Sequence, residues 1–262
     1  MITSTANPHV KHIRSLAADR KERRRERMFV LEGVRLIADA LASGAALELA
    51  LYAPEQLEAT QAGRELMARL RELPRALEAS PQVVRAASDT VHPQGVVALA
   101  RWPSPAPGRP GLLLVLDAVQ DPGNLGTLLR SAEAVGVAEV LCAPGTADVY
   151  APKVVRAAMG AHFRLALEQD IGWEAIDERL ATVDHVYAAE AGATMPYYAA
   201  DWRQPSALII GSEASGLSED ARARATKRIG IPMRGGAESL NAAVAGSVIL
   251  FEALRQRSLG RS

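Results

Sequence analysis

The C-terminal half of this 262-residue chain contains one unit three times: a nearly continuous apolar segment, a polar loop and a segment that favours a helix. The apolar segments are residues 112–119, 207–210 and 229–233. Such runs are typical of parallel strands that are covered on both faces. Because ligands bind beyond the carboxyl ends of the strands in open α/β sheets, we expect the three loops to line one pocket. This repeated unit predicts an α/β fold.

The first unit has the clearest helix signals. Asp-Pro-Gly-Asn at 121–124 is a turn that leads into an expected helix over 125–135, and Gly136 is expected to end it in the left-handed conformation. Apolar residues with the 3.6-residue period form its buried stripe, so Arg130 projects from roughly the opposite side. Arg130 is then either available to a ligand or paired with Glu133, and the spacing alone favours the ordinary ion pair.

The N-terminal half has the pattern of a smaller α/β sandwich. Expected strands at 28–31 and 47–52 alternate with expected helices at 33–42 and 61–73. The sequence RWPSPAPGRPG at 101–111 disfavours both helix and internal strand because it is rich in proline and glycine. We therefore expect two domains, residues 1–104 and residues 105–262.

Positive charge is concentrated near the N-terminus, although the whole chain has no formal net charge. Residues 9–35 contain nine Lys and Arg but only four Asp and Glu. Clustered guanidinium groups bind phosphates bidentately and gain further from counterion release. The alternative is a solvated helix on which Glu22 and Glu26 pair with neighbouring arginines, and charge does not decide between the two. The candidate phosphate-binding residues are Arg20, Arg23, Arg24, Arg25 and Arg27.

The sequence lacks the motifs of several other ligand classes. It contains no G-x-G and no Walker A motif, which argues against the usual dinucleotide and P-loop sites. The five histidines are scattered and the single Cys142 lies in an apolar segment, so we expect neither a metal site nor a disulfide. No apolar stretch is long enough for a membrane span, and the first residues lack a signal segment. These absences predict a cytoplasmic protein with no membrane role.

Taken together, the three loops resemble the SpoU family of RNA 2′-O-ribose methyltransferases within the SPOUT superfamily. The resemblance rests on DPGNLGTLLRSAEAVG at 121–136, IIGSEASGL at 209–217 and IPMRGGAESLNAAVAGSVILFEAL at 231–254, with APKVVRAAMGAHF at 151–163 between them. ERMFVLEG at 26–33 and HPQGVVAL at 92–99 resemble the ribosomal-protein-like substrate-binding domain that often precedes the catalytic domain. Ala214, Ala242 and Ala243 are small departures from the family pattern, and His162 stands where an aliphatic residue is usual.

The resemblance implies a fold, a cofactor and a set of site residues. The fold is an α/β sheet whose C-terminal region is threaded as a trefoil knot. The implied cofactor is S-adenosyl-L-methionine, held by the backbones of Gly211, Ile231 and Leu240. The implied polar residues around the reacting ribose are Asn124, Arg130, Glu213, Ser239 and Asn241.

Within that implied set, Arg130 is the family's proposed activating residue. A guanidinium holds its proton strongly and is therefore a poor base. We therefore expect Arg130 to hold the hydroxyl and the adjacent phosphate, with Glu213 orienting it and with a phosphate or water assisting proton loss.

The resemblance also implies partners. RNA would contact the arginine-rich segment, ribosomal RNA is favoured over transfer RNA by the two-domain layout, and a homodimer would form through the terminal helix. The small residues of that helix are alternatively explained by close packing inside the knot. Two other functions stay open: a catalytically inactive RNA-binding protein of ribosome assembly, and an enzyme that confers antibiotic resistance by modifying a drug site on ribosomal RNA.

Overall fold

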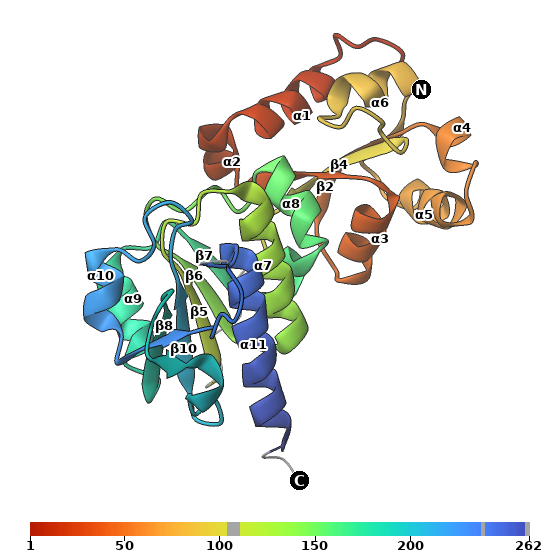
Figure 1. The fold of residues 1–262 in the computed structure, drawn as a ribbon. Coiled ribbons are helices and arrows are strands. Elements are labelled where there is room, and N and C mark those ends of the chain that lie inside the picture. The colour runs from red at the N-terminus through yellow and green to blue at the C-terminus, as the bar shows by residue number, and fades with distance from the viewer. Residues whose placement is uncertain (104–110, 237–238, 260–262) are drawn as a thin grey trace. The chain divides into compact units, whose positions relative to one another are not determined.

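The computed structural model describes residues 1–103, 111–236 and 239–259 of the chain. Two compact units are present, one formed by Met1–Pro103 with Tyr150–Phe163 and the other by Ser104–Val149 with Arg164–Ser262. Most of the predicted linker lies at 104–110, outside the described residues. The domain division predicted at residue 104/105 therefore stays a prediction. Figure 1 shows the elements of both units in chain order.

The first unit is built on a four-stranded mixed sheet in the order β1-β4-β2-β3. Its strands are β1 (Met28–Glu32), β2 (Leu47–Tyr52), β3 (Ala76–Glu78) and β4 (Val96–Arg101). β4 pairs antiparallel with β1 and β2, whereas β2 and β3 are parallel. The strands predicted at 28–31 and 47–52 are confirmed as β1 and β2.

Four of the helices of this unit have a side-chain N-cap. Asn7, Asp19, Thr60 and Ser80 each accept a hydrogen bond from a backbone N–H at the start of a helix. The two helices predicted at 33–42 and 61–73 are present as α3 and α5. The helices are α1 (Pro8–Ala18), α2 (Arg20–Glu26), α3 (Val34–Ala42), α4 (Pro54–Leu57), α5 (Gln61–Arg71) and α6 (Pro81–Ala87).

A segment from the second half of the sequence packs in the first unit. It contains α8 (Pro152–Ala158) and the short 3-10 helix η1 (Ala161–Phe163). The Phe29 ring centroid lies 5.0 Å from that of Tyr150 and 5.8 Å from that of His162, and Trp102 stacks on Tyr150 at 4.2 Å. His162, the residue that departs from the family pattern, is therefore buried in an aromatic cluster.

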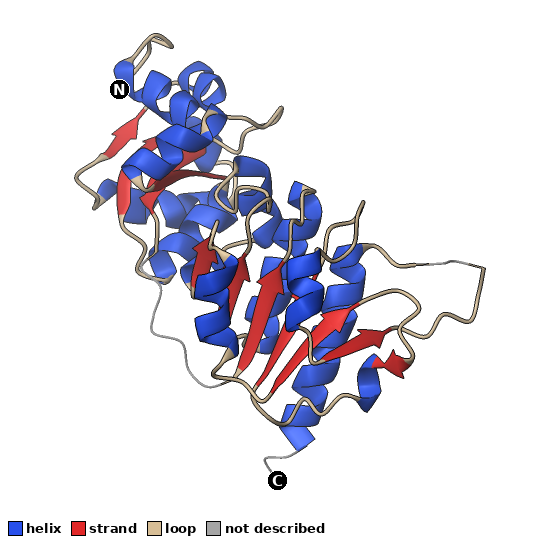
Figure 2. Cartoon of the chain, turned by 90° about the vertical axis from the view of Figure 1, so that its left-hand side faces the viewer, coloured by secondary structure: helices blue, strands red, loops and turns tan. Residues whose placement is uncertain are grey.

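The second unit is built on a seven-stranded sheet in the order β7-β6-β5-β10-β8-β11-β9. Its neighbouring strands are all parallel, and Figure 2 shows them as a twisted array. The strands are β5 (Leu112–Leu116), β6 (Glu139–Cys142), β7 (Leu167–Gln169), β8 (His185–Ala189), β9 (Met195–Pro196), β10 (Ser206–Ile210) and β11 (Lys227–Gly230).

In two of the three apolar segments, the strand ends earlier than the apolar pattern suggests. β5 stops at Leu116 although the apolar run continues to Val119, and β11 stops at Gly230 rather than Met233. In β11 the cause is Pro232, which has no amide proton to donate to a neighbouring strand. The residues beyond each strand end are consequently in loops at the carboxyl edge of the sheet.

Helices cover both faces of this sheet. They are α7 (Pro122–Val135), α9 (Trp173–Leu180), α10 (Glu219–Arg224) and α11 (Ala242–Leu259), together with the short 3-10 helix η2 (Tyr197–Ala199). α9 and α10 share an apolar cluster with sheet residues that include Ile209. The next residue, Ile210, points to the opposite face and contacts α11, which lies beside α7 (Figure 1).

The small residues of α11 allow it to approach α7 closely. A Cβ atom at Gly246 would lie 2.4 Å from Cδ2 of Leu128, and the hydroxyl oxygens of Ser131 and Ser247 are 2.7 Å apart. Close packing against α7 therefore accounts for Gly246. The trefoil threading implied by the resemblance stays a prediction. Within the described residues, no helix is long and apolar enough to cross a membrane.

Candidate active site

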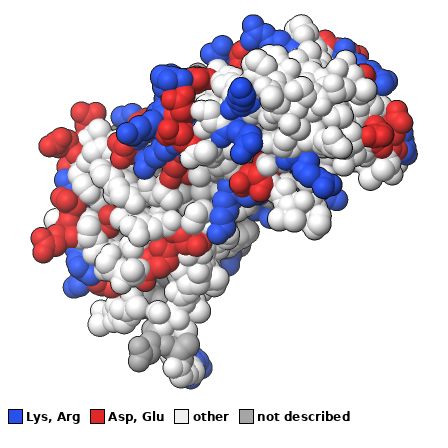
Figure 3. Space-filling model, turned by 90° about the horizontal axis from the view of Figure 1, so that it is seen from above, with Lys and Arg blue, Asp and Glu red and all other residues white. Residues whose placement is uncertain are grey.

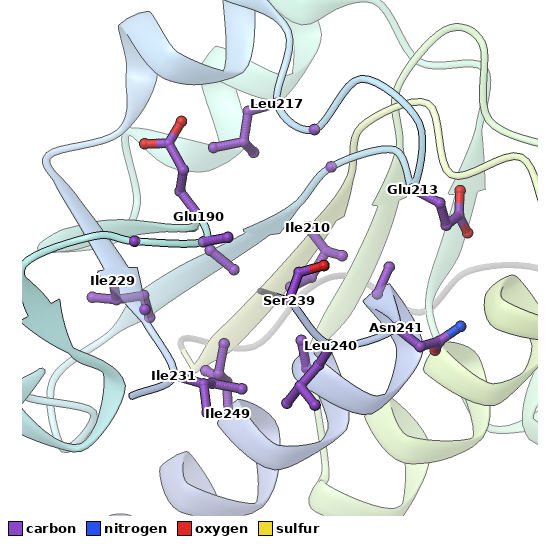
Figure 4. A pocket seen from close by; sticks show the side chains of 18 of the residues that line it. Glu190, Ile210, Glu213, Leu217, Ile229, Ile231, Ser239, Leu240, Asn241 and Ile249 are labelled. Carbon is purple, nitrogen blue, oxygen red and sulfur yellow. The ribbon is translucent and has the colours of Figure 1, made fainter. Parts of the chain in front are cut away.

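A cavity of about 520 Å³ opens at the carboxyl ends of β8, β10 and β11 and beside the start of α11. Its apolar walls are the side chains of Ile210, Leu217, Ile229, Ile231, Leu240 and Ile249, and Figure 4 shows these residues around the opening. Small-molecule sites in proteins have volumes of about 300–1,000 Å³ and apolar walls with a few polar groups. The size and lining fit an adenosyl compound.

All three residues that the resemblance assigned to cofactor binding line this cavity: Gly211, Ile231 and Leu240. Gly211 is buried, and a Cβ atom there would lie 2.4 Å from the backbone oxygen of Gly216. Ser212 and Gly216 exchange two backbone hydrogen bonds of 2.9 Å, with Gly216 at φ +67°. This tight turn leaves backbone rather than side chain at the cavity wall next to Gly211.

Asp117 fixes the other end of the same loop. Its side chain is buried at the end of β5, and one carboxylate oxygen accepts a hydrogen bond of 2.7 Å from the backbone N–H of Ser218. The backbone N–H of Asp117 in turn donates to the carbonyl of Ile210. Sequence reasoning missed Asp117, because a single acid within an apolar run gives no sign of which loop it will meet.

A polar network joins the three loops that the sequence placed in one pocket. The Nδ2 atom of Asn124 donates to Oε1 of Glu213 at 2.7 Å, and Nδ2 of Asn241 donates to Oδ1 of Asn124 at 2.9 Å. The backbone N–H of Gln120 approaches the second oxygen of Glu213 at 3.4 Å. Glu213 and Asn241 also line the cavity, so the network lies at the cavity rim. The loop that contains Asn124 contributes no residue to the lining, so the expectation that all three loops line one pocket is wrong for this loop, which only contacts the other two.

Local capping positions two members of that network. The backbone N–H of Asn124 donates to Asp121 at the start of α7. Oδ1 of Asn241 accepts from the backbone N–H groups of Ala243 and Val244 at 2.9 and 3.2 Å, at the start of α11. Both residues therefore lie at a helix N-terminus, and their side-chain amides are hydrogen-bonded to each other. Ser239, the remaining predicted polar residue of this loop, also lines the cavity.

Arg130 lies on α7, six residues after Asn124, and its side chain is exposed. This side chain makes no ion pair or hydrogen bond with any other described residue. The ion pair with Glu133 that the spacing favoured is wrong, because Glu133 instead binds Nε of Arg164 at 2.9 Å. The expected orienting contact from Glu213 is also not made, because Glu213 is engaged by Asn124.

The arginine-rich segment divides into structural and exposed side chains. Arg23 is only 4% exposed, and its guanidinium donates to the carbonyls of Leu16 and Ala17 at 2.6 and 2.9 Å. It therefore caps the end of α1. Arg25 pairs with Glu22 and Glu26, as the alternative reading of a solvated helix expected.

The other arginines of this segment are more accessible. Arg24 and Arg27 are exposed, Arg20 is half-buried, and the guanidinium carbon of Arg27 lies 5.8 Å from the Trp102 ring centroid. Figure 3 shows a surface on which Lys and Arg lie among Asp and Glu rather than forming one unbroken basic area. Phosphate contacts from this segment would therefore come from individual exposed arginines.

Cys142 is fully buried in β6, as expected, and burial raises the pKa of its thiol to about 12. The described parts of the chain contain no group of three or more His, Cys, Asp or Glu side chains that could hold a metal ion.

Residues 111–251 match the SpoU rRNA Methylase family, and residues 7–98 match the MRM3-like substrate binding domain. The chain is 33% identical to rRNA methyltransferase 3A, mitochondrial, of Danio rerio, across 93% of this chain and 67% of that protein. It is 31% identical to the 23S rRNA (guanosine(2553)-2′-O)-methyltransferase RlmP of Bacillus subtilis, across 95% of this chain and 97% of that protein.

The fold is also similar to solved structures. The SpoU methyltransferase AviRb from Streptomyces viridochromogenes, in complex with the cofactor AdoMet, aligns with a TM-score of 0.84 and 31% identity, across 96% of this chain and 98% of that chain. The similarity covers both units, since the aligned share is nearly the whole chain.

Proposed function

Because the chain belongs to the SpoU rRNA Methylase family, we propose that it transfers a methyl group from S-adenosylmethionine to a ribose 2′-hydroxyl of ribosomal RNA. The observation that carries this proposal is the hydrogen-bonded set of Asn124, Glu213 and Asn241 at the rim of the apolar cavity. Three segments remote in sequence meet there, and each contributes one of its polar residues.

The residues that line the cavity have the chemistry needed to bind the methyl donor. Gly211, Ile231 and Leu240 offer backbone groups to the polar edges of an adenine, and the surrounding isoleucines offer contact to its faces. When bound, S-adenosylmethionine supplies a methyl carbon on a positively charged sulfur. Methyl transfer forms an oxygen–carbon bond as the carbon–sulfur bond breaks, so the residues must align the three atoms.

Arg130 has the charge and the freedom to hold the acceptor. Its guanidinium is exposed and unpaired among the described residues, so it is available to a phosphate and to the 2′-oxygen as negative charge develops there. The hydroxyl proton passes to the RNA phosphate or to water rather than to the guanidinium, which is a poor base. Asn124 and Asn241 hold the loops or the ribose, while Glu213 fixes Asn124.

The first unit would bind the RNA through its arginine-rich segment. We assign this contact to Arg20, Arg24, Arg25 and Arg27, and we leave Arg23 out because its guanidinium caps α1. RNA affinity should fall with increasing salt as phosphate contacts are screened.

A homodimer through α11 accompanies this proposal. Val244, Val248 and Phe251 follow one another at helical spacing and are 48%, 37% and 50% exposed, whereas most apolar residues of such a helix would be covered. The substrate and the single buried cysteine favour a reducing compartment in which ribosomes are assembled.

The decisive experiment incubates the protein with tritiated S-adenosylmethionine and either ribosomal or transfer RNA. We expect label in ribosomal RNA, at a linkage that resists alkaline cleavage because its 2′-oxygen is methylated. Label in transfer RNA alone would assign the other substrate. Donor binding without transfer to any RNA would indicate an assembly factor that has lost catalysis.

A further inference from the structure

A second acidic residue lines the cavity, and no part of the proposed mechanism uses it. Glu190 directly follows β8 and lines the cavity. Figure 4 shows Glu190 and Glu213 on opposite sides of the opening, with Glu190 near Leu217 and Ile229. Glu213 is hydrogen-bonded to Asn124, on the side of the cavity where we place the reacting ribose. Glu190 would therefore contact a different part of a ligand bound in the cavity.

Contacts from two other elements hold the Glu190 carboxylate in place. One oxygen accepts from Nε of Arg222 on α10 at 3.2 Å, and the other accepts from Nη1 of Arg228 on β11 at 3.0 Å. The backbone of Glu190 is fixed as well, because its N–H donates to the carbonyl of Ile229 at 2.9 Å. The side chain is three-quarters buried, at 25% exposure. Its position is therefore set before a ligand binds.

The carboxylate keeps hydrogen-bonding capacity for a ligand. An ionised carboxylate has about four acceptor positions, and the two arginines occupy two of them. A ribose offers two adjacent hydroxyl donors, which match the spacing of two carboxylate oxygens. An acidic residue at the end of a strand binds ribose hydroxyls in dinucleotide-binding sheets for the same reason.

The alternative is a surface ion-pair network that only links α10 to β11. Exposed pairs of this kind contribute little to stability, and Arg222 and Arg228 are 45% and 62% exposed. A purely structural network does not require its members to line a cavity, yet the residues Glu190 and Arg222 both do so.

We propose that Glu190 is the residue that recognises the ribose diol of the adenosyl donor, with Arg222 and Arg228 holding its carboxylate in position. This inference rests on the proposed function, because it assigns one more contact within the same cavity. Glu190 would thus determine selectivity for a ribonucleoside over a deoxyribonucleoside cofactor.

The test compares binding of S-adenosylhomocysteine with that of its 2′-deoxy and 3′-deoxy analogues by isothermal titration calorimetry. We expect the wild-type protein to bind the parent compound about tenfold or more tightly than either analogue, the effect of a hydrogen bond to a charged group. In E190A the parent and the analogues should bind about equally. E190Q should retain part of the difference, because its amide oxygen still accepts. E178A, which removes an exposed carboxylate on α9 outside the cavity, serves as the control.

The outcomes separate this inference from the function on which it rests. If the wild-type protein binds no adenosyl compound, the proposed function fails. If it binds them and E190A keeps the wild-type ratio between parent and analogue, only the role of Glu190 is wrong. Methylthioadenosine, which has the same ribose but lacks the amino acid, is measured as a further ligand. If E190A instead changes the affinity ratio between S-adenosylhomocysteine and methylthioadenosine, Glu190 faces the ammonium group and the ribose assignment is overturned.

Discussion

At the scale of single residues, the most informative feature is the difference between Arg23 and Arg130. Both are arginines on helices, but Arg23 donates to two carbonyls at the end of α1, whereas Arg130 has no partner among the described residues. Burial of a guanidinium requires hydrogen-bond acceptors, and α1 supplies them. The charge of Arg130 is left for an external anion.

Replacing Arg130 should therefore separate chemistry from donor binding. In R130A we expect the methyl-transfer rate to fall by about 100-fold or more, because a charged donor that stabilises developing negative charge is lost. The dissociation constant for S-adenosylhomocysteine should change by less than about twofold, since Arg130 does not line the cavity. Single-turnover transfer and calorimetry measure the two quantities.

Arg203, whose guanidinium binds Asp201 on the surface, provides the matched control for this experiment. R203A should leave both the rate and the affinity close to those of the wild-type protein. Simultaneous loss of donor binding and transfer in R130A would contradict the separation of roles.

The buried thiol gives a prediction at the same scale. Cys142 is the single cysteine, is fully buried, and has a pKa raised by desolvation to about 12. At about pH 8, where an ordinary thiol is partly ionised, Cys142 should remain protonated and inaccessible. We expect no reaction with Ellman's reagent in the folded protein and one thiol per chain after denaturation. Rapid labelling of the folded protein would show that β6 opens locally.

At the scale of elements, the site depends on how strand ends are connected to one another. β5 and β10 are neighbours, so the residues that follow them leave the same edge of the sheet. Asp117 then joins the loop after β10 to the end of β5 through the N–H of Ser218. The same loop carries Gly211 in the cavity wall and Glu213 in the polar network. Asp117 is thus a positioning residue, acting through the loop.

Replacement of Asp117 tests that positioning role. D117A removes the acceptor for Ser218 N–H, so we expect affinity for S-adenosylhomocysteine to fall by about tenfold, the cost of leaving one buried donor unpaired. D117N retains an acceptor oxygen and should recover most of the affinity. Equal losses in D117A and D117N, or an unchanged affinity in both, would show that the hydrogen bond does not position the loop. Thermal unfolding of each variant checks that the fold is retained.

At the scale of the whole molecule, each unit has a surface suited to a different partner. The first unit carries the exposed arginines of α2 and its neighbouring residues, which suit a polyanion. The second unit carries the apolar stripe of α11, formed by Val244, Val248 and Phe251. Charge and apolar area are thus on different elements, so RNA binding and self-association can be altered separately.

The apolar stripe predicts a specific effect on oligomeric state. We expect the wild-type protein to be a dimer and F251E to be a monomer, because a carboxylate would be placed in an apolar interface. Light scattering after size-exclusion chromatography measures the mass. V91E changes an exposed apolar residue of the first unit and should remain dimeric. A monomeric wild-type protein, or a dimeric F251E, would rule out this face as the interface.

The amino-acid sequence determined the local structure and most of the site. Apolar runs fix β5 and β10, because strand residues covered on both faces are apolar at every position. Asp121 and Gly136 fix the ends of α7 through an N-cap and a left-handed C-cap. Resemblance to a family identified the three loops. The loops after β10 and β11 line the cavity, and the loop after β5 contacts both of them through Asn124 at its rim. These features depend on short stretches of chain, so they can be read before the fold is known.

The tertiary structure alone decided which distant groups meet. Five features depend on neighbours that are far away in the sequence. They are the order of the strands, the burial of Arg23, the packing of residues 150–163 with the first unit, the contact of Asp117 with Ser218 and the position of Glu190. A charged residue has the same local sequence pattern whether its side chain faces solvent, a backbone carbonyl or a cavity. Its partner is set by the folded chain, and the partner determines whether its charge is structural or free to bind.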